Sequence, residues 1–157
     1  MPFVYGTARH VNDTTSGTAN TEVDHLRTLT GTTRAASITG VYVIGKGAGL
    51  TAISGIVIRV RRFATASTVG TAIAPAPKDP TAPAAILTAF TLPTAGVTAT
   101  QQLAFGCGAA GPGGWVARDR DSEILLVAGG GANGNLDLFS ASGTVSLSFE
   151  YALEHLE

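Results

Sequence analysis

Residues 145–153 read Val-Ser-Leu-Ser-Phe-Glu-Tyr-Ala-Leu, and this stretch decides the fold class. Its five large apolar residues occupy every second position and alternate with serine, glutamate and alanine. A period of two is typical of a β-strand with one buried face. We therefore predict a terminal strand whose apolar face enters a core and whose other face meets water or a partner.

The residues before this stretch predict two further strands. The apolar runs 123–128 and 135–139 are separated by the glycine-rich residues 129–134, and residues 140–143 turn into the terminal strand. Strand, flexible turn and strand is the reading that such spacing favours. We expect these three consecutive strands to form an antiparallel meander.

Further strands are predicted at a spacing of about ten residues, which gives about eight to ten strands in all. The clearest are 37–45 and 54–63, and the weaker ones are 3–9, 67–73, 84–90, 98–105 and 115–118. Residues 82–89 could instead form a helical turn or two. We predict an all-β fold, an antiparallel two-sheet β-sandwich, and prefer a jelly roll because of the strand number and the long connections.

Two segments look irregular. Residues 10–33 are rich in Thr, Ser, Gly and Asn, so they are expected to be a surface loop or an arm that orders against a neighbouring subunit. This gives an N-terminal strand and irregular arm over 1–33 and a sandwich over 34–157, as one domain. Residues 75–83 contain four prolines and predict an extended excursion.

The composition excludes several classes of protein. Ten Lys and Arg against eleven Asp and Glu give a net charge of −1, and charged residues are 13% of the chain, about half the usual share. We therefore expect neither a nucleic-acid partner nor a disordered polyelectrolyte. No apolar run is long enough for a membrane span, and the N-terminus lacks the pattern of a signal peptide.

Catalytic, metal and cofactor sites are not expected. The chain has three histidines and one cysteine, Cys107, with no nucleophile elbow, so Cys107 is interpreted as a structural thiol. Asp119 and Asp121 alternate with arginines and favour a solvated turn over a cation site. The glycine clusters 45–49 and 106–114 lack phosphate-binding fingerprints and favour turns between strands.

Charge and aromatic positions give the candidate interface. Three arginines fall on one predicted strand, where a solvated sheet face or a salt bridge between subunits is favoured over nucleic-acid binding. Between Phe63 and Ala117 the only charged residues are one adjacent pair. The single tryptophan is interpreted as a lid on the core, although an exposed one could anchor a partner or stack on a sugar. The candidate interface residues are Arg59, Arg61, Arg62, Lys78, Asp79 and Trp115.

Four segments carry a resemblance that covers residues 38–154 at the level of pattern. They are 56–62 (Ile-Val-Ile-Arg-Val-Arg-Arg), 74–80 (Ala-Pro-Ala-Pro-Lys-Asp-Pro), 115–126 and 144–151. In these segments the chain resembles the decoration or cement proteins of tailed-phage heads. The resemblance implies a jelly roll or related sandwich, a binding activity without catalytic residues or cofactors, and a homotrimer. It also implies a major capsid protein as partner and a place on the outer capsid surface of the virion, reached from the host cytoplasm.

The residues favour an assembly role independently of that resemblance. So little charge over residues 63–117 predicts an exposed neutral patch, and such patches commonly become interfaces. Two alternatives are a carbohydrate- or receptor-binding domain of a phage fibre or spike, and an enzyme that uses Cys107 or a histidine. The first requires Trp115 to lie exposed beside Tyr42 or Tyr151.

Overall fold

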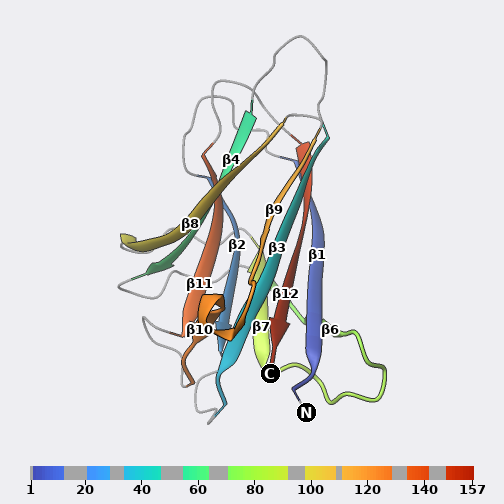
Figure 1. Cartoon of the computed structure of the whole chain (residues 1–157). Coiled ribbons are helices and arrows are strands. Elements are labelled where there is room, and N and C mark those ends of the chain that lie inside the picture. The colour runs from blue at the N-terminus through green and yellow to red at the C-terminus, as the bar shows by residue number, and fades with distance from the viewer. Residues whose placement is uncertain are drawn as a thin grey trace.

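The computed structural model describes residues 2–12, 21–28, 34–46, 55–63, 71–91, 98–108, 111–128, 134–141 and 148–157. Within these ranges the chain forms twelve strands and one short 3-10 helix, η1 (Arg120–Ser122). The strands make two antiparallel six-stranded sheets, which confirms the predicted all-β sandwich (Figure 1). The jelly-roll connectivity stays a prediction.

Sheet A contains the two chain ends that the structure describes. Its central strand β12 (Ser148–Leu156) pairs with β1 (Val4–Asn12) and with β3 (Ala36–Lys46). The pairing of β1 with β12 continues one residue further, since the backbone groups of Phe3 and Glu157 exchange hydrogen bonds of 3.1 Å. The edges of sheet A are β6 (Ala76–Pro77) beside β1, and β10 (Ile124–Leu126) and β9 (Pro112–Val116) beside β3.

Sheet B has the order β5, β7, β2, β11, β4, β8. Its edges are the short strand β5 and the long strand β8, which lies at the outer border of the sheet in Figure 1. The strand bounds are β5 (Thr71–Ile73), β7 (Leu87–Thr91), β2 (Thr21–Thr28), β11 (Asn135–Ala141), β4 (Gly55–Phe63) and β8 (Thr98–Gly108).

The core lies between the two sheets and follows from the period of two. Within residues 41–44, 57–60 and 150–156 alternate side chains are buried while their neighbours along the strand are more exposed, and Leu136 and Leu138 of β11 are also buried. Burial of each of these branched and aromatic side chains stabilises the folded state by about 1.5 to 3 kcal/mol, so the packing of the two sheets is the main stabilising term. The inward pairs are Val41 and Val43, Tyr151 and Leu153, Ile58 and Val60, and Leu136 and Leu138.

The expected irregular arm is wrong for residues 21–28. These residues form β2, which pairs with β7 on one side and β11 on the other and is therefore an interior strand of sheet B. Residues 10–12 also belong to β1. The neighbouring strands β7 and β11 supply hydrogen-bond partners on both sides of β2. The segment therefore forms a strand although its apolar residues alternate only weakly with polar ones.

The expected meander is also wrong. The strands β10 and β12 belong to sheet A, where β3 lies between them, whereas β11 lies in sheet B between β2 and β4. Consecutive strands therefore cross between sheets instead of pairing. The predicted strand 115–118 begins earlier, at Pro112, and ends at Val116. Residues 82–86 form no helix, and residues 87–91 form β7.

Candidate functional site

Four large apolar side chains on β3, β9 and β10 are exposed on the outer side of sheet A. Val116, Ile44, Leu125 and Tyr42 are 55%, 52%, 50% and 38% exposed. The pairing registers place Tyr42 and Ile44 opposite residues of β9 and β12 that also point outward, because the alternate positions of these strands are buried. We call this surface, defined by these four side chains, the sheet A face.

The residues paired with Tyr42 on this face are small. Tyr42 is paired with Gly114 on β9 and with Ala152 on β12, and Ala152 is in turn paired with Ala8 on β1. Such a surface offers apolar area without side chains that must be ordered on contact. The sheet A face therefore has the character of a protein interface.

The charged groups that adjoin Tyr42, toward the β6 edge of the sheet, are paired. The Lys78 ammonium forms an ion pair with Oε1 of Glu154, and the Tyr42 hydroxyl donates to Oε2 of the same carboxylate at 3.3 Å. Partial burial and the neighbouring carboxylate raise the pKa of Tyr42. The phenol is thereby kept as a neutral hydrogen-bond donor to the Glu154 carboxylate.

Two glycines permit this arrangement. A Cβ at Gly40 would lie 2.9 Å from Cε2 and from the hydroxyl oxygen of Tyr42, so the tyrosine ring lies directly over Gly40. A Cβ at Gly114 would lie 2.7 Å from the backbone oxygen of Val41, so β9 approaches β3 too closely for any side chain there.

Lys78 and Asp79 form the turn that follows β6. The Lys78 amide donates to the backbone oxygen of Val4 at 2.9 Å. Oδ1 of Asp79 accepts hydrogen bonds from the Thr81 hydroxyl at 2.7 Å and from its amide at 2.8 Å, and these bonds lower the pKa of Asp79. The turn thus positions Lys78 against Glu154 at the β6 edge of sheet A.

A shallow depression of about 380 Å³ lies beside this ion pair. Residues of β1, β6 and β12 line it, and its charged groups are Lys78 and Glu154. It is open to solvent and lined mainly by backbone and small side chains, unlike the enclosed apolar pockets that hold small molecules. A protein surface is a better fit for it than a metabolite.

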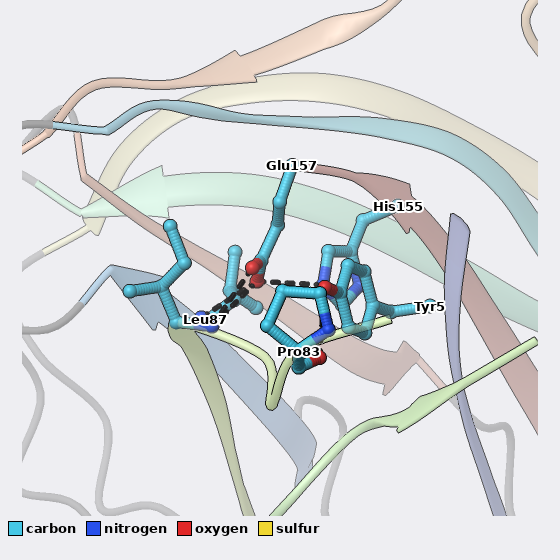
Figure 2. A network of polar contacts seen from close by, with 6 residues as sticks. Tyr5, Pro83, Leu87, His155 and Glu157 are labelled. Atoms are coloured by element: carbon cyan, nitrogen blue, oxygen red, sulfur yellow. Dashed lines mark hydrogen bonds and ion pairs between the residues drawn. The ribbon is translucent and has the colours of Figure 1, made fainter. Parts of the chain in front are cut away.

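A second polar cluster is buried between the sheets where β12 ends (Figure 2). Nε2 of His155 lies 3.2 Å from Oε1 of Glu157, and the two side chains are 0% and 1% exposed. The Glu157 carboxylate also accepts hydrogen bonds from the amides of Ile86 and Leu87 at 2.8–2.9 Å. This carboxylate therefore holds the start of β7 against the end of β12.

Tyr5 completes the buried cluster. Its ring stacks on the His155 imidazole with a centroid distance of 5.3 Å and an interplanar angle of 14°, and its hydroxyl donates to the backbone oxygen of Pro83 at 3.1 Å. Burial and the Glu157 charge raise the pKa of Tyr5. Burial also raises the pKa of Glu157, but the hydrogen bonds from His155 and the two amides hold it below its ordinary value.

The cluster has the composition of a catalytic site but not the access of one. His155 and Tyr5 are 0% and 1% exposed, and Nδ1 of His155 has no hydrogen-bond partner among the described residues. No described nucleophile adjoins the histidine, and a substrate could not reach it without opening the sandwich. The arrangement therefore stabilises the end of the sheet.

The three predicted interface arginines do not form one surface. Arg59 is partly exposed on the outer side of β4, whereas Arg61, just after a register shift, is only 8% exposed, which is contrary to a solvated sheet face. The Arg62 guanidinium donates to the backbone oxygen of Leu125 on β10 and so links the two sheets. Partial burial lowers the pKa of Arg62.

Trp115 packs against the core, as the interpretation of a core lid predicts. It lies on β9 opposite the buried residue Val41, whereas Tyr42 points to the other face of sheet A. Tyr151 is only 2% exposed. The aromatic platform that sugar binding would require is therefore not formed by Trp115 with either tyrosine.

The remaining candidate residues carry no site. Cys107 lies in β8 opposite Ile56, and its side chain is outside the described part of the structure. Asp119 caps η1, where its side chain accepts from the Ser122 amide and the Ser122 hydroxyl accepts from the Asp119 amide. No group of three or more metal-ligating side chains occurs among the described residues, and none of their helices could span a membrane.

Lys78 and Asp79 stay predictions as interface residues, and sequence reasoning missed the residues of the buried cluster. Glu157 and Tyr5 were not singled out. A signal was present, since positions 151, 153, 155 and 157 continue one inward period of two and the last two are polar. Polar residues at inward positions of a strand predict a buried hydrogen-bonded pair.

Comparison with known proteins gives little further guidance. No family model and no curated protein match the chain. Solved structures of VP2 from infectious bursal disease virus are similar at a low level. A mutant VP2 in T=1 particles has 12% identity and a TM-score of 0.20 over 99% of this chain and 40% of its own. The Gx strain structure has 10% identity and a TM-score of 0.20 over 99% and 42%. The chain thus spans about two fifths of these viral VP2 chains, and a likeness of this size carries no argument.

Proposed function

We propose that this chain is a non-enzymatic structural protein of a phage virion that binds the outer surface of the assembled capsid and stabilises it as a decoration protein, forming a homotrimer. The observation that carries the proposal is the sheet A face, with four large apolar side chains 38–55% exposed and the charged groups beside Tyr42 already paired. Apolar surface of this extent on a small domain marks an interaction site.

The resemblance in residues 38–154 supplies the kind of partner. The major capsid protein, repeated over the shell, offers many identical sites to a protein of several copies. A protein that binds the assembled shell more tightly than separated subunits stabilises the shell by mass action. Several copies linked together bind with an effective concentration that multiplies weak contacts.

Co-sedimentation with undecorated capsids of the same phage tests this proposal. We expect the wild-type protein to sediment with capsids, and Ile44→Glu combined with Val116→Glu to weaken binding by at least about a hundredfold, because two buried unpaired charges each cost a few kcal/mol. The matched control is Val57→Glu, which places the same charge at a 38% exposed valine on sheet B. The trimer is read separately by sedimentation equilibrium.

Two outcomes overturn the proposal. One is a wild-type protein that never sediments with capsids. The other is that the Val57→Glu control loses capsid binding to the same extent as the sheet A variant. Equal loss would show that the sheet A face is not the capsid contact. A purified protein that stays at the 15.8 kDa of one chain would remove the trimer alone.

A further inference from the structure

The edge strands of the two sheets differ in how they are protected against pairing with another chain. Proteins blunt exposed edges with short strands, prolines or charged residues. The edge strands β5, β6 and β10 have three, two and three residues. The five-residue edge strand β9 begins with Pro112, and the Arg62 guanidinium occupies the backbone oxygen of Leu125 on β10.

The edge strand β8 has none of these devices over its second half. It spans eleven residues, Thr98–Gly108, that include no charged residue and no proline. Register shifts against β4 are confined to its first half, so Leu103–Gly108 is regularly paired with Gly55–Val60. Among the described residues β8 pairs with no strand other than β4; β9, which follows it in the chain, approaches it without strand pairing, so the backbone groups on the other side of β8 belong to no described β-ladder.

The core is also incompletely covered at β8. Leu103 and Phe105 pack against the buried cluster yet are only partly buried, whereas their partners Val60 and Ile58 are 0% and 1% exposed. An added strand with apolar residues at alternate positions would cover them. The strand that fits the β8 edge is therefore uncharged and has one apolar face.

We propose that the free edge of β8 over Leu103–Gly108 binds a strand edge from a second copy of this chain. Charge favours this occupant, because both edges of sheet B, β8 and β5, lie within the stretch 63–117 that has only Lys78 and Asp79 as charged residues. Pairing between copies thus brings no like charges together and no buried charge to desolvate. The inference rests on the self-association in the proposed function but not on its capsid partner.

The number of copies in the oligomer distinguishes which edge of the second copy pairs with β8. Two β8 edges pair about a twofold axis and give a dimer, because such a contact is the same surface on both copies. Pairing of β8 with a different edge of the next copy is a head-to-tail contact, which gives a ring such as the expected trimer when the rotation between copies closes. Either result supports the β8 edge as the contact between copies.

Sedimentation equilibrium of charge variants tests the proposal. Ala104 is exposed on the outer side of β8, so Ala104→Lys leaves the core intact and puts a charge on the edge. We expect it to raise the dissociation constant of self-association at least about tenfold through repulsion and desolvation. Val57→Lys is the matched control, since Val57 is on the same outer side of sheet B but on the interior strand β4.

Further measurements keep the test decisive. If circular dichroism shows that Ala104→Lys is unfolded, Gln102→Lys, at another exposed position of β8, takes its place. Amide hydrogen exchange of the wild type should slow in residues 103–108 as concentration rises, and not in β4. A wild type that is monomeric at every concentration, association unchanged by the β8 variants, or equal loss in Val57→Lys would each overturn the proposal. Failure of capsid binding with self-association intact would instead remove only the capsid role.

Discussion

Nε2 of His155 lies 3.2 Å from Oε1 of Glu157, in a cluster where neither side chain has more than 1% of its surface exposed. The same carboxylate accepts hydrogen bonds from the amides of Ile86 and Leu87, which lie 71 and 70 residues away in the sequence. Figure 2 shows these groups converging on the carboxylate. A single side chain thus connects β12 of sheet A to the beginning of β7 of sheet B.

Glu157→Gln is expected to destabilise the fold by about 1.5 to 3 kcal/mol, the range for hydrogen bonds to a charged group. The amide retains the shape but accepts on one oxygen only and has no charge for His155. Urea unfolding followed by tryptophan fluorescence measures the change. The control Glu123→Gln alters a partly exposed glutamate outside the cluster, and it should leave the midpoint unchanged. Equal midpoints for both variants would show that the buried carboxylate does not stabilise the sheets.

The pKa of Glu157 gives this contribution a defined pH dependence. Because hydrogen bonds hold its pKa in the folded state below the ordinary value of 4.5, the ionised form is preferentially stabilised by folding. The contribution is fully present above pH 4.5 and is lost as the pH falls through the lower folded-state value. The unfolding free energies of wild type and Glu157→Gln should therefore differ at pH 6 and converge as the pH falls through this acid window. A difference that stays constant down to the acid limit would contradict the lowered pKa.

Tyr5 is expected to act at the opposite end of the pH scale. Its pKa is raised above the ordinary value of 10.0 by burial and by the Glu157 charge, so folding favours the neutral phenol. The resulting stability is present below pH 10 and decreases as the pH rises through the folded-state value. Thermal unfolding between pH 8 and pH 11 should show a steeper loss for wild type than for Tyr5→Phe. Parallel curves would indicate that Tyr5 ionises in the folded protein as it does in water.

The period of two was enough to predict the strands that build the core, because β3, β4 and β12 each bury alternate apolar residues. It failed for β2. Residues 21–28 carry Val23 and Leu26 three positions apart, and the register of β2 against β11 omits Val23 from the pairs, so a local irregularity breaks the alternation. The meander failed for a different reason, since which sheet a strand joins depends on distant partners.

The sequence predicted that an exposed apolar surface exists but not which strands form it. Low charge predicted an exposed neutral patch within 63–117, but three of the four residues of the sheet A face, Tyr42, Ile44 and Leu125, lie outside that stretch. Tyr42 and Ile44 lie in a strand whose sequence looks simply apolar. Their exposure follows from the pairing of β3 with β9 and β12, which local pattern does not encode.

Deletion of residues 1–28 is expected to abolish folding. It removes β1, which lies between β12 and β6, and β2, which lies between β11 and β7, so hydrogen-bonded strands are lost from both sheets. Size-exclusion chromatography and far-UV circular dichroism of the truncated protein should show an expanded or aggregated chain without a cooperative thermal transition. A compact truncated protein with β-sheet circular dichroism and a cooperative transition would contradict this role and favour a dispensable arm.

Gly114→Ala is expected to destabilise the protein by about 1 to 3 kcal/mol, the usual cost of a methyl group forced into a packed site. The added Cβ would lie 2.7 Å from the backbone oxygen of Val41, so β9 must move away from β3. The matched control is Gly6→Ala, where the nearest atom would be 3.8 Å from the Cβ, at ordinary contact distance. Thermal unfolding should separate the two variants, with a lower midpoint for Gly114→Ala and almost no change for Gly6→Ala. Because β9 carries Val116 on the sheet A face and Trp115 on the core, Gly114→Ala should also increase the tryptophan's exposure to acrylamide quenching. A stable Gly114→Ala protein with unchanged quenching would mean that β9 is not held against β3 as closely as the backbone indicates.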